Sequence, residues 1–268
     1  DNKKWQDHVQ ERIKRMVLSQ KSNICITIWS MASQMGDGFC QQAAYDYMKE
    51  LTSLPVQYDF QQGKGKAKCD IYAIKDAPVG ELVSFIDKAD KPVILSHFNN
   101  ATGASGGGLK EYMNLFIKEK KIVGGCVWQF CDNTLTNSQY KDVYGGMSEE
   151  FIHDFTQCAS GYFDSRRKPY TAAENLKHSY RPLFARLLDP KTLEIFNTNS
   201  FNDAGYIDIQ LRVFANGKER SRVALKSTVK PLEIRTYDIF IGHLDGDIFL
   251  NIDYYDKRFC TNTKSNGG

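Results

Sequence analysis

The chain has 268 residues, with 35 basic and 32 acidic side chains that give a net charge of +3. Hydrophobic residues make up 41% of it and charged residues 25%, proportions typical of a soluble globular protein. The basic residues are scattered, and no run approaches the roughly 20 apolar residues of a membrane helix. A nucleic-acid-binding surface and a membrane span are therefore not expected.

The first part of the chain alternates between helical and strand patterns. Apolar residues at helical spacing predict helices at 5–18, 41–51, 81–89 and 109–118. Short apolar runs predict buried strands at 24–29, 56–58, 69–74, 92–95 and 122–130. This alternation predicts a parallel α/β sheet or barrel, in which the residues just past each strand perform the chemistry. The fourth strand is followed by Ser96-His97-Phe98 and a glycine-rich loop that contains no acidic residue.

The pattern changes after about residue 180. Alternating apolar and polar residues predict strands at 193–197, 206–214, 221–225, 232–241 and 248–256. Asn216-Gly217 is a strong hairpin signal between two of them. We therefore expect an α/β domain at 1–180, an immunoglobulin-like β-sandwich at 181–260 and a polar tail at 261–268.

The cysteine usage bears on the cellular compartment. There are seven, an odd number, and none forms a CxxC pair. Cys25, Cys69, Cys126 and Cys131 lie in or beside apolar runs, where we expect them to pack as small hydrophobic residues. This usage favours a reducing, intracellular setting over a disulfide framework. The sequence begins at Asp1 without a methionine, so we also expect processing or truncation upstream.

Five short motifs occur in a fixed order along the α/β half. They are 28–38 (IWSMASQMGDG), 55–58 (PVQY), 69–72 (CDIY), 92–108 (PVILSHFNNATGASGGG) and 124–132 (GGCVWQFCD). In order and spacing they resemble the β-galactosidases of glycoside hydrolase family 2. The resemblance implies the later part of a (β/α)8 TIM-type barrel, about five strands, followed by the sandwich.

The family's chemistry is retaining hydrolysis by two carboxyl groups about 5 Å apart, one an acid/base and one a nucleophile. The resemblance puts the acid/base glutamate on Gln34, the asparagine before it on Ser33, and the nucleophile on His97. Both catalytic glutamates are thus expected to be replaced. A pocket histidine of the family falls on Asn100, and a sugar-contacting asparagine falls on Cys158.

Three aromatic residues of the family pattern are retained. Tyr72 matches a tyrosine that assists catalysis, Trp128 a sugar-stacking tryptophan and Phe155 a gating phenylalanine. The family's magnesium uses the acid/base glutamate and ligands upstream of Asp1, so we expect no catalytic metal and no cofactor. Structural roles also fit these residues: Trp128 and Phe155 as core, Tyr72 as a residue closing the barrel mouth. His97 also fits a packing role, and nothing in the sequence pairs the loop acids, Asp37 and Asp76, into a substitute catalytic dyad.

The first hypothesis is a catalytically inactive β-galactosidase-like protein that acts as a structural or interaction subunit of a larger assembly. Five strands do not close a barrel of eight, so a protein partner or upstream residues would complete it. The first alternative is a carbohydrate-binding module that takes a galactoside-type sugar on Trp128, Tyr72 and Phe155. The second is an active glycosidase with relocated catalytic groups.

Overall fold

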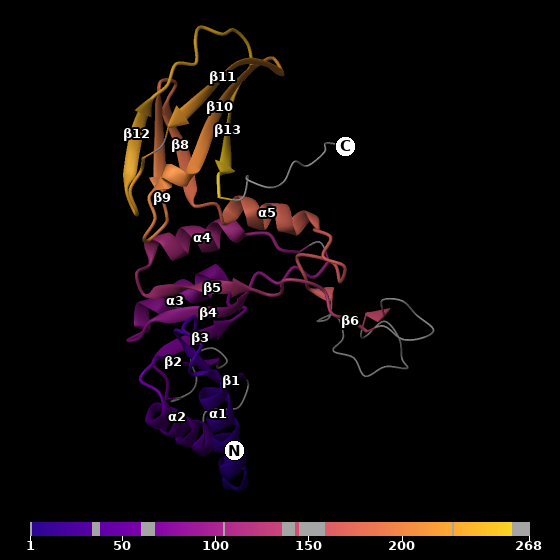
Figure 1. Ribbon diagram of the computed structural model, residues 1–268. Coiled ribbons are helices and arrows are strands. Elements are labelled where there is room, and N and C mark those ends of the chain that lie inside the picture. The colour runs from indigo at the N-terminus through magenta and orange to yellow at the C-terminus, as the bar shows by residue number, and fades with distance from the viewer. Residues whose placement is uncertain are drawn as a thin grey trace. The chain divides into compact units, whose positions relative to one another are not determined.

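The computed structural model describes residues 2–33, 38–59, 68–103, 105–135, 143–144, 159–226 and 228–258. The chain divides into two units, Asp1–Ser179 and Tyr180–Gly268. Each unit contains its own hydrophobic core. They are described separately below (Figure 1).

The first unit is built on one parallel sheet of five strands in sequential order, β1-β2-β3-β4-β5. The strands are β1 (Trp29–Ser33), β2 (Val56–Asp59), β3 (Ile71–Lys75), β4 (Val93–Phe98) and β5 (Ile122–Val127). The helices are α1 (Gln6–Gln20), α2 (Phe39–Leu51), α3 (Val79–Lys88), α4 (Leu109–Lys118) and α5 (Thr171–Ser179), and the 3-10 helix η1 (Lys3–Trp5) precedes α1. In Figure 1 the strands follow one another from β1 to β5, which lies beside α4. A two-stranded ribbon, β6 (Thr134–Leu135) and β7 (Val143–Tyr144), follows β5.

The helices cover one face of this sheet. Val56 and Tyr58 of β2 pack with buried residues of α1 and α2, and Leu95 and Phe98 of β4 pack with α3 and α4. Tyr58 pairs with Tyr72, which also packs on this side, so β2 and β3 share the covered face. Neighbouring strands in sequential order with helices on one face form an arc of a TIM-type barrel, whose helices lie outside. The predicted partial barrel is confirmed.

The opposite face of the sheet, the inner face of the arc, carries polar side chains. Successive residues of a strand point to opposite faces, so Gln57 and Asp59 point away from the helices. Lys75 belongs to the same face because Ala73, two residues before it, pairs with Asp59. This face is more polar than the apolar interior that is usual for a closed barrel.

The second unit is a sandwich of two three-stranded sheets, ordered β11-β10-β13 and β12-β9-β8. Its strands are β8 (Leu183–Asp189), β9 (Thr192–Asn197), β10 (Ile207–Ala215), β11 (Lys218–Lys226), β12 (Ile234–Asp238) and β13 (Ile248–Asp256), with a 3-10 helix η3 (Ala204–Tyr206) before β10. Strand pairs within both sheets are antiparallel. Asn216 and Gly217 have φ angles of +50° and +75°, which confirms the predicted hairpin between β10 and β11.

Several boundaries differ from the prediction. The strand predicted at 24–29 is wrong: β1 begins at Trp29, where pairing with Val56 starts, and Ile24 is 100% exposed. No described strand pairs with the apolar run 24–28, so its composition alone did not make it a strand. Strand β8 and helix α5 were not predicted. Cys25 and Cys126 are exposed and not packed in a core, whereas Cys40 and Cys69 are buried.

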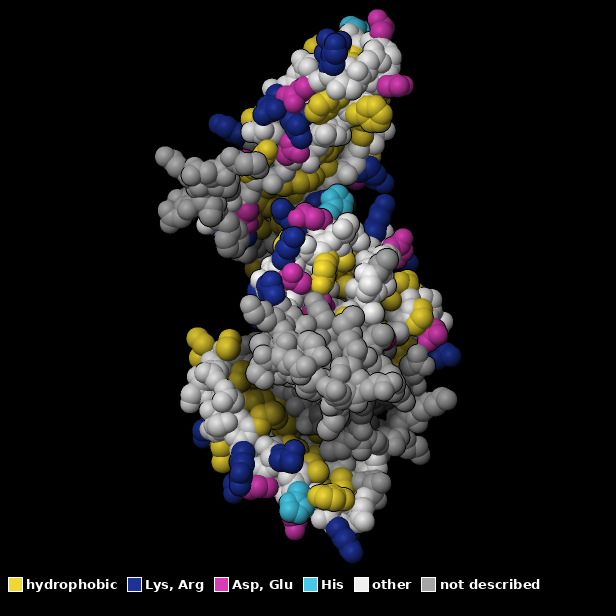
Figure 2. All heavy atoms as spheres, turned by 90° about the vertical axis from the view of Figure 1, so that its right-hand side faces the viewer, with side chains coloured by type: hydrophobic (Ala, Val, Ile, Leu, Met, Phe, Trp, Pro, Cys, Tyr) yellow, Lys and Arg dark blue, Asp and Glu magenta, His cyan; other side chains and the backbone are white. Residues whose placement is uncertain are grey.

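The charges on the surface agree with the scattered basic residues of the sequence. On the face drawn in Figure 2, Lys and Arg side chains are interspersed with Asp and Glu, so this face carries no basic stripe. Within the described part of the chain, no helix is long and apolar enough to cross a membrane.

Candidate functional site

His97 lies near the carboxyl end of β4, on the inner face of the arc. It pairs with Lys75, the last residue of β3. Its carbonyl oxygen accepts a hydrogen bond of 2.9 Å from the Asp76 backbone N–H. The sequence predicted His97 just beyond a strand ending at Leu95, but β4 continues to Phe98 and contains it. This edge of the sheet is where barrel enzymes carry their catalytic groups.

The imidazole of His97 stacks on the indole of Trp128. The two ring centroids are 4.0 Å apart and the ring planes differ by 26°. Trp128 immediately follows β5, and its backbone N–H donates to the Phe98 carbonyl oxygen at 3.1 Å. The peptide bond between Trp128 and Gln129 is cis. One face of the Trp128 ring is thus covered by a side chain of the protein itself.

An ion pair borders this stack. Lys75 Nζ lies 3.5 Å from Asp59 Oδ2, and Asp59 is buried. Burial lowers the pKa of His97, and the positive charge of Lys75 lowers it further, while Asp59 and Asp76 act in the opposite direction. The net shift is downward from 6.5, so His97 is neutral at pH 7. His97 is therefore a neutral imidazole that stacks on an indole beside a lysine ammonium. It cannot act as a carboxylate nucleophile.

Tyr72 lies at the opposite edge of the sheet. It is the second residue of β3 and pairs with Val93, the first residue of β4. Its hydroxyl donates to Asp90 at 2.9 Å and its ring meets Phe85 edge-on at 5.6 Å. These contacts put it on the helix-covered side at the amino end of the strands. This position does not fit the alternative role considered for Tyr72, that of closing the barrel mouth.

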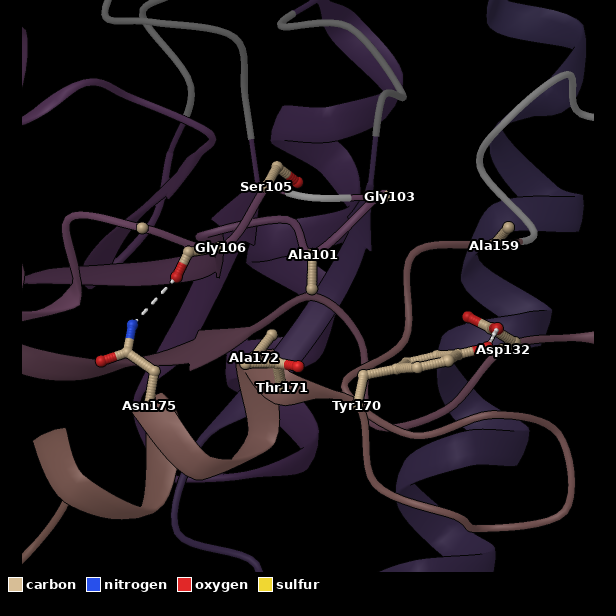
Figure 3. A pocket seen from close by; sticks show the side chains of 11 residues that line it. Ala101, Gly103, Ser105, Gly106, Asp132, Ala159, Tyr170, Thr171, Ala172 and Asn175 are labelled. Atoms are coloured by element: carbon tan, nitrogen blue, oxygen red, sulfur yellow. Dashed lines mark hydrogen bonds between the residues drawn. The ribbon is translucent and has the colours of Figure 1, made fainter.

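The glycine-rich loop after β4 encloses a pocket of about 650 Å³ with the start of α5 (Figure 3). Asn100 precedes this loop, but its side-chain oxygen accepts from the Thr102 N–H and hydroxyl within the same turn. Among the described residues, no group of three or more His, Cys, Asp and Glu side chains could hold a metal ion.

The model of the family described as "Glycosyl hydrolases family 2, TIM barrel domain" matches residues 1–184 of the chain. The chain belongs to glycosyl hydrolase family 2. The match covers the whole first unit, whose parallel arc is the part of the chain that forms the family's barrel fold.

Relatives of this chain include two bacterial β-galactosidases. The chain is 25% identical over 280 residues to β-galactosidase 2 of Enterobacter cloacae, covering 96% of this chain and 27% of that protein. It is 27% identical over 256 residues to the β-galactosidase of Actinobacillus pleuropneumoniae, covering 92% of this chain and 25% of that protein. The chain thus spans about a quarter of the length of these relatives. A solved β-glucuronidase of Bacteroides uniformis is 11% identical, with a TM-score of 0.48, over 96% of this chain and 37% of that one.

For this family 2 chain, several predicted site residues lie outside the described residues: Gln34, Phe155, Asp37 and Cys158. Ser33 is the last residue of β1. Of the predicted site residues that the structure describes, His97 and Trp128 are brought together. Tyr72 and Asn100 are not part of that cluster.

Two members of the cluster, Asp59 and Lys75, were missed in the sequence. Each is the last residue of its strand. A charged residue that ends a run of otherwise apolar residues was a usable signal, because the carboxyl ends of parallel strands meet at one edge. Both strands were predicted to end one residue earlier, at Tyr58 and Ile74, which left these side chains in loops.

Proposed function

We propose that the chain is a catalytically inactive, β-galactosidase-like member of family 2 that serves as a structural or interaction subunit of a larger assembly. Its barrel is completed by another polypeptide or by residues upstream. The observation that carries the proposal is the stack of His97 on Trp128, because the family resemblance assigns these two positions to the nucleophile and to a sugar-stacking ring.

The chemistry of retaining hydrolysis supports inactivity. The reaction needs a carboxyl group that protonates the leaving oxygen and a carboxylate that forms the glycosyl intermediate. The family resemblance assigns these roles to positions 34 and 97, which hold glutamine and histidine. An amide cannot deliver the proton, and removal of groups that act as a unit abolishes most of the rate enhancement.

The charges around His97 support the same conclusion. The transition state of glycoside hydrolysis carries positive charge on the sugar. Lys75 is close enough to depress the pKa of His97, so its ammonium would oppose such a charge at this edge of the sheet. Its partner Asp59 is already engaged in the 3.5 Å ion pair.

The open arc supports a role in an assembly. β1 and β5 each pair with one strand only, and no described strand covers their other edges. Unpaired edges favour association with another polypeptide. On the inner face, the side-chain oxygen of Gln57 is buried and has no hydrogen-bond partner among the described residues. Strands that close the barrel would bring donors to it.

The geometry gives less support to the alternatives. A sugar-binding floor built from Trp128, Tyr72 and Phe155 needs Tyr72 beside Trp128, but Tyr72 bonds Asp90 at the other edge of the sheet. An active glycosidase with relocated groups would need a carboxylate pair near Trp128. Asp59, whose charge acts on His97, is already paired with Lys75.

Turnover of a nitrophenyl β-galactoside tests inactivity. The protein in its natural assembly is compared with a His97→Ala variant and with His243→Ala, a control on the second unit. We expect no hydrolysis above the uncatalysed rate for any of the three. Hydrolysis by the unmodified protein that His97→Ala abolishes and His243→Ala preserves would overturn the proposal.

Native mass spectrometry of the protein from its own cells tests the assembly. We expect this chain to be held by other polypeptides. A single longer polypeptide would assign the closing strands to upstream residues and reject a separate subunit. A lone chain of this mass would reject the completed barrel altogether.

A further inference from the structure

A preformed pocket lies apart from the stack of His97 and Trp128. Its walls are the loop after β4 and the start of α5, with the segment after β5 at one side (Figure 3). Small residues leave the space open: Ala101, Gly103, Gly106, Gly107, Ala159 and Ala172. A volume of about 650 Å³ is within the range of small-molecule sites.

The loop is fixed against α5 by hydrogen bonds. Asn175 Nδ2 donates to the Gly106 carbonyl oxygen at 3.3 Å, and Ser105 Oγ donates to carbonyl oxygens within the loop at 2.7 Å. Gly106 has a φ of +97°, and a Cβ built there would lie 3.4 Å from Ala172 Cβ. A Cβ there would make ordinary van der Waals contact with Ala172, so the positive φ and not a lack of space favours glycine at this position. Such a pocket does not need to be organised by its ligand.

The opposite side of the pocket is fixed by Asp132. This carboxylate is buried, and its two oxygens accept from the Gly161 N–H and the Tyr170 hydroxyl, both at 2.7 Å. Figure 3 shows the bonded pair Tyr170 and Asp132 on one side and Asn175 on the other. The lining thus combines an aromatic ring, a carboxylate and an amide, all held by neighbours.

The charges of the lining exclude strongly charged ligands. Asp132 disfavours an anion, and none of the lining residues that the structure describes is Lys, Arg or His. The first turn of α5 carries the positive end of the helix dipole, which disfavours a cation. The two effects oppose each other, so the pocket favours an uncharged molecule with many hydrogen-bonding groups. Thr171 and Asn175 supply polar side chains to the lining.

We propose that this pocket binds a small, neutral, polyhydroxylated molecule, in the size range of a cyclic polyol or monosaccharide. The site is independent of the proposed loss of catalysis, because it uses neither His97 nor Trp128. Apolar surface from the alanines, glycines and Tyr170 contacts the ring of the ligand, and the hydroxyls exchange hydrogen bonds with the polar lining.

Saturation-transfer NMR on the protein in its natural assembly tests the proposal with three probes of matched size. They are myo-inositol, its monophosphate and an amino-substituted inositol. We expect binding of myo-inositol, with both charged probes at least about fivefold weaker, since Asp132 opposes the anion and the positive end of the α5 dipole opposes the cation. A preference for either charged probe, equal binding of all three, or no binding of any probe would overturn the proposal.

Two variants locate the site. Ala172→Leu fills the pocket and is expected to abolish binding, while Thr171→Val removes one hydroxyl at nearly constant volume and is expected to weaken binding about fivefold. Lys177→Ala, an exposed position on the same helix that does not line the pocket, is the control and leaves binding unchanged. If Ala172→Leu fails to fold, Thr171→Val decides alone. Binding unchanged in Thr171→Val would place the ligand elsewhere and reject the pocket.

Discussion

The imidazole of His97 lies on the indole of Trp128 with 4.0 Å between ring centroids, next to the ammonium group of Lys75. Two strands that are neighbours in the sheet, β4 and β5, end side by side and bring these rings together. The contact makes His97 observable, because a protonated imidazole quenches the emission of an adjacent indole.

The first prediction concerns the pH dependence of tryptophan emission. Burial and Lys75 lower the pKa of His97 below 6.5, against the weaker opposing effects of Asp59 and Asp76. We expect emission to fall as the pH is lowered, with a midpoint below 6.5, and His97→Gln to remove that step. Fluorescence titration between pH 8 and 4 measures it.

A control is required because Trp5 also contacts a histidine, His8, at 5.6 Å between ring centroids. His8→Gln should leave the step assigned to His97 in place. In the His8→Gln background, a step with a midpoint above 6.5, or one that persists when His97→Gln is added, would contradict the stacked neutral imidazole. The same depressed pKa has a consequence for stability. The contribution of neutral His97 to the free energy of unfolding is complete above pH 6.5. It is lost as the pH falls through the lower pKa that His97 has in the folded state.

The second prediction concerns Tyr72. Burial and the hydrogen bond to Asp90 raise its pKa to about 12. We expect Tyr72→Phe to remove one tyrosine that ionises near pH 12 in an absorbance titration, while the emission step of His97 stays unchanged. Because the folded pKa is raised, the stabilisation from Tyr72 is complete below pH 10 and is lost as the pH rises toward 12. A shift in the His97 step would argue that Tyr72 lies at the barrel mouth after all.

The third prediction concerns packing behind β5. A Cβ on Gly125 would lie 2.9 Å from Phe98 Cε1 and 3.0 Å from Leu95 Cβ. We expect Gly125→Ala to lower the free energy of unfolding by about 1–3 kcal/mol, the usual cost of overpacking a core. Gly80→Ala is the matched control, since nothing lies within 4 Å of a Cβ there and the position is inside α3. It should stabilise the helix by about 0.5 kcal/mol. Urea denaturation measures both, and equal effects of the two substitutions would contradict the packing.

The fourth prediction concerns the buried carboxylate of Asp132. Asp132→Ala leaves the Gly161 N–H without its acceptor, so we expect a loss of about 2–3 kcal/mol. Tyr170→Phe removes only a hydroxyl bonded to the same carboxylate and should cost about 1 kcal/mol. The double variant should lose less than the sum of the two, because both remove one shared hydrogen bond. Strict additivity in denaturation midpoints would mean that the two side chains do not interact.

The sequence was informative where local pattern and fold agree. The helix predicted at 109–118 matches α4, because Leu109 and Leu115 are buried at helical spacing. The hairpin at Asn216-Gly217 depends on backbone angles that these residues favour locally. Strand 24–29 failed because an apolar run becomes a strand only when a neighbour pairs with it, and pairing begins at Trp29.

The sequence by itself determined the family, the alternation of strands and helices from β2 to β5, and the matches of positions 34, 72, 97 and 128 to the family's motifs, since all of these follow from local pattern and motif spacing. The tertiary structure decided which of those residues meet. Strand register carried Tyr72 to the edge opposite His97, and the parallel strands brought Lys75 and Asp59 together beside the stacked rings. It also formed the pocket between α5 and a loop some 65 to 70 positions earlier in the chain. Contacts between distant segments depend on register and packing, which no local pattern specifies.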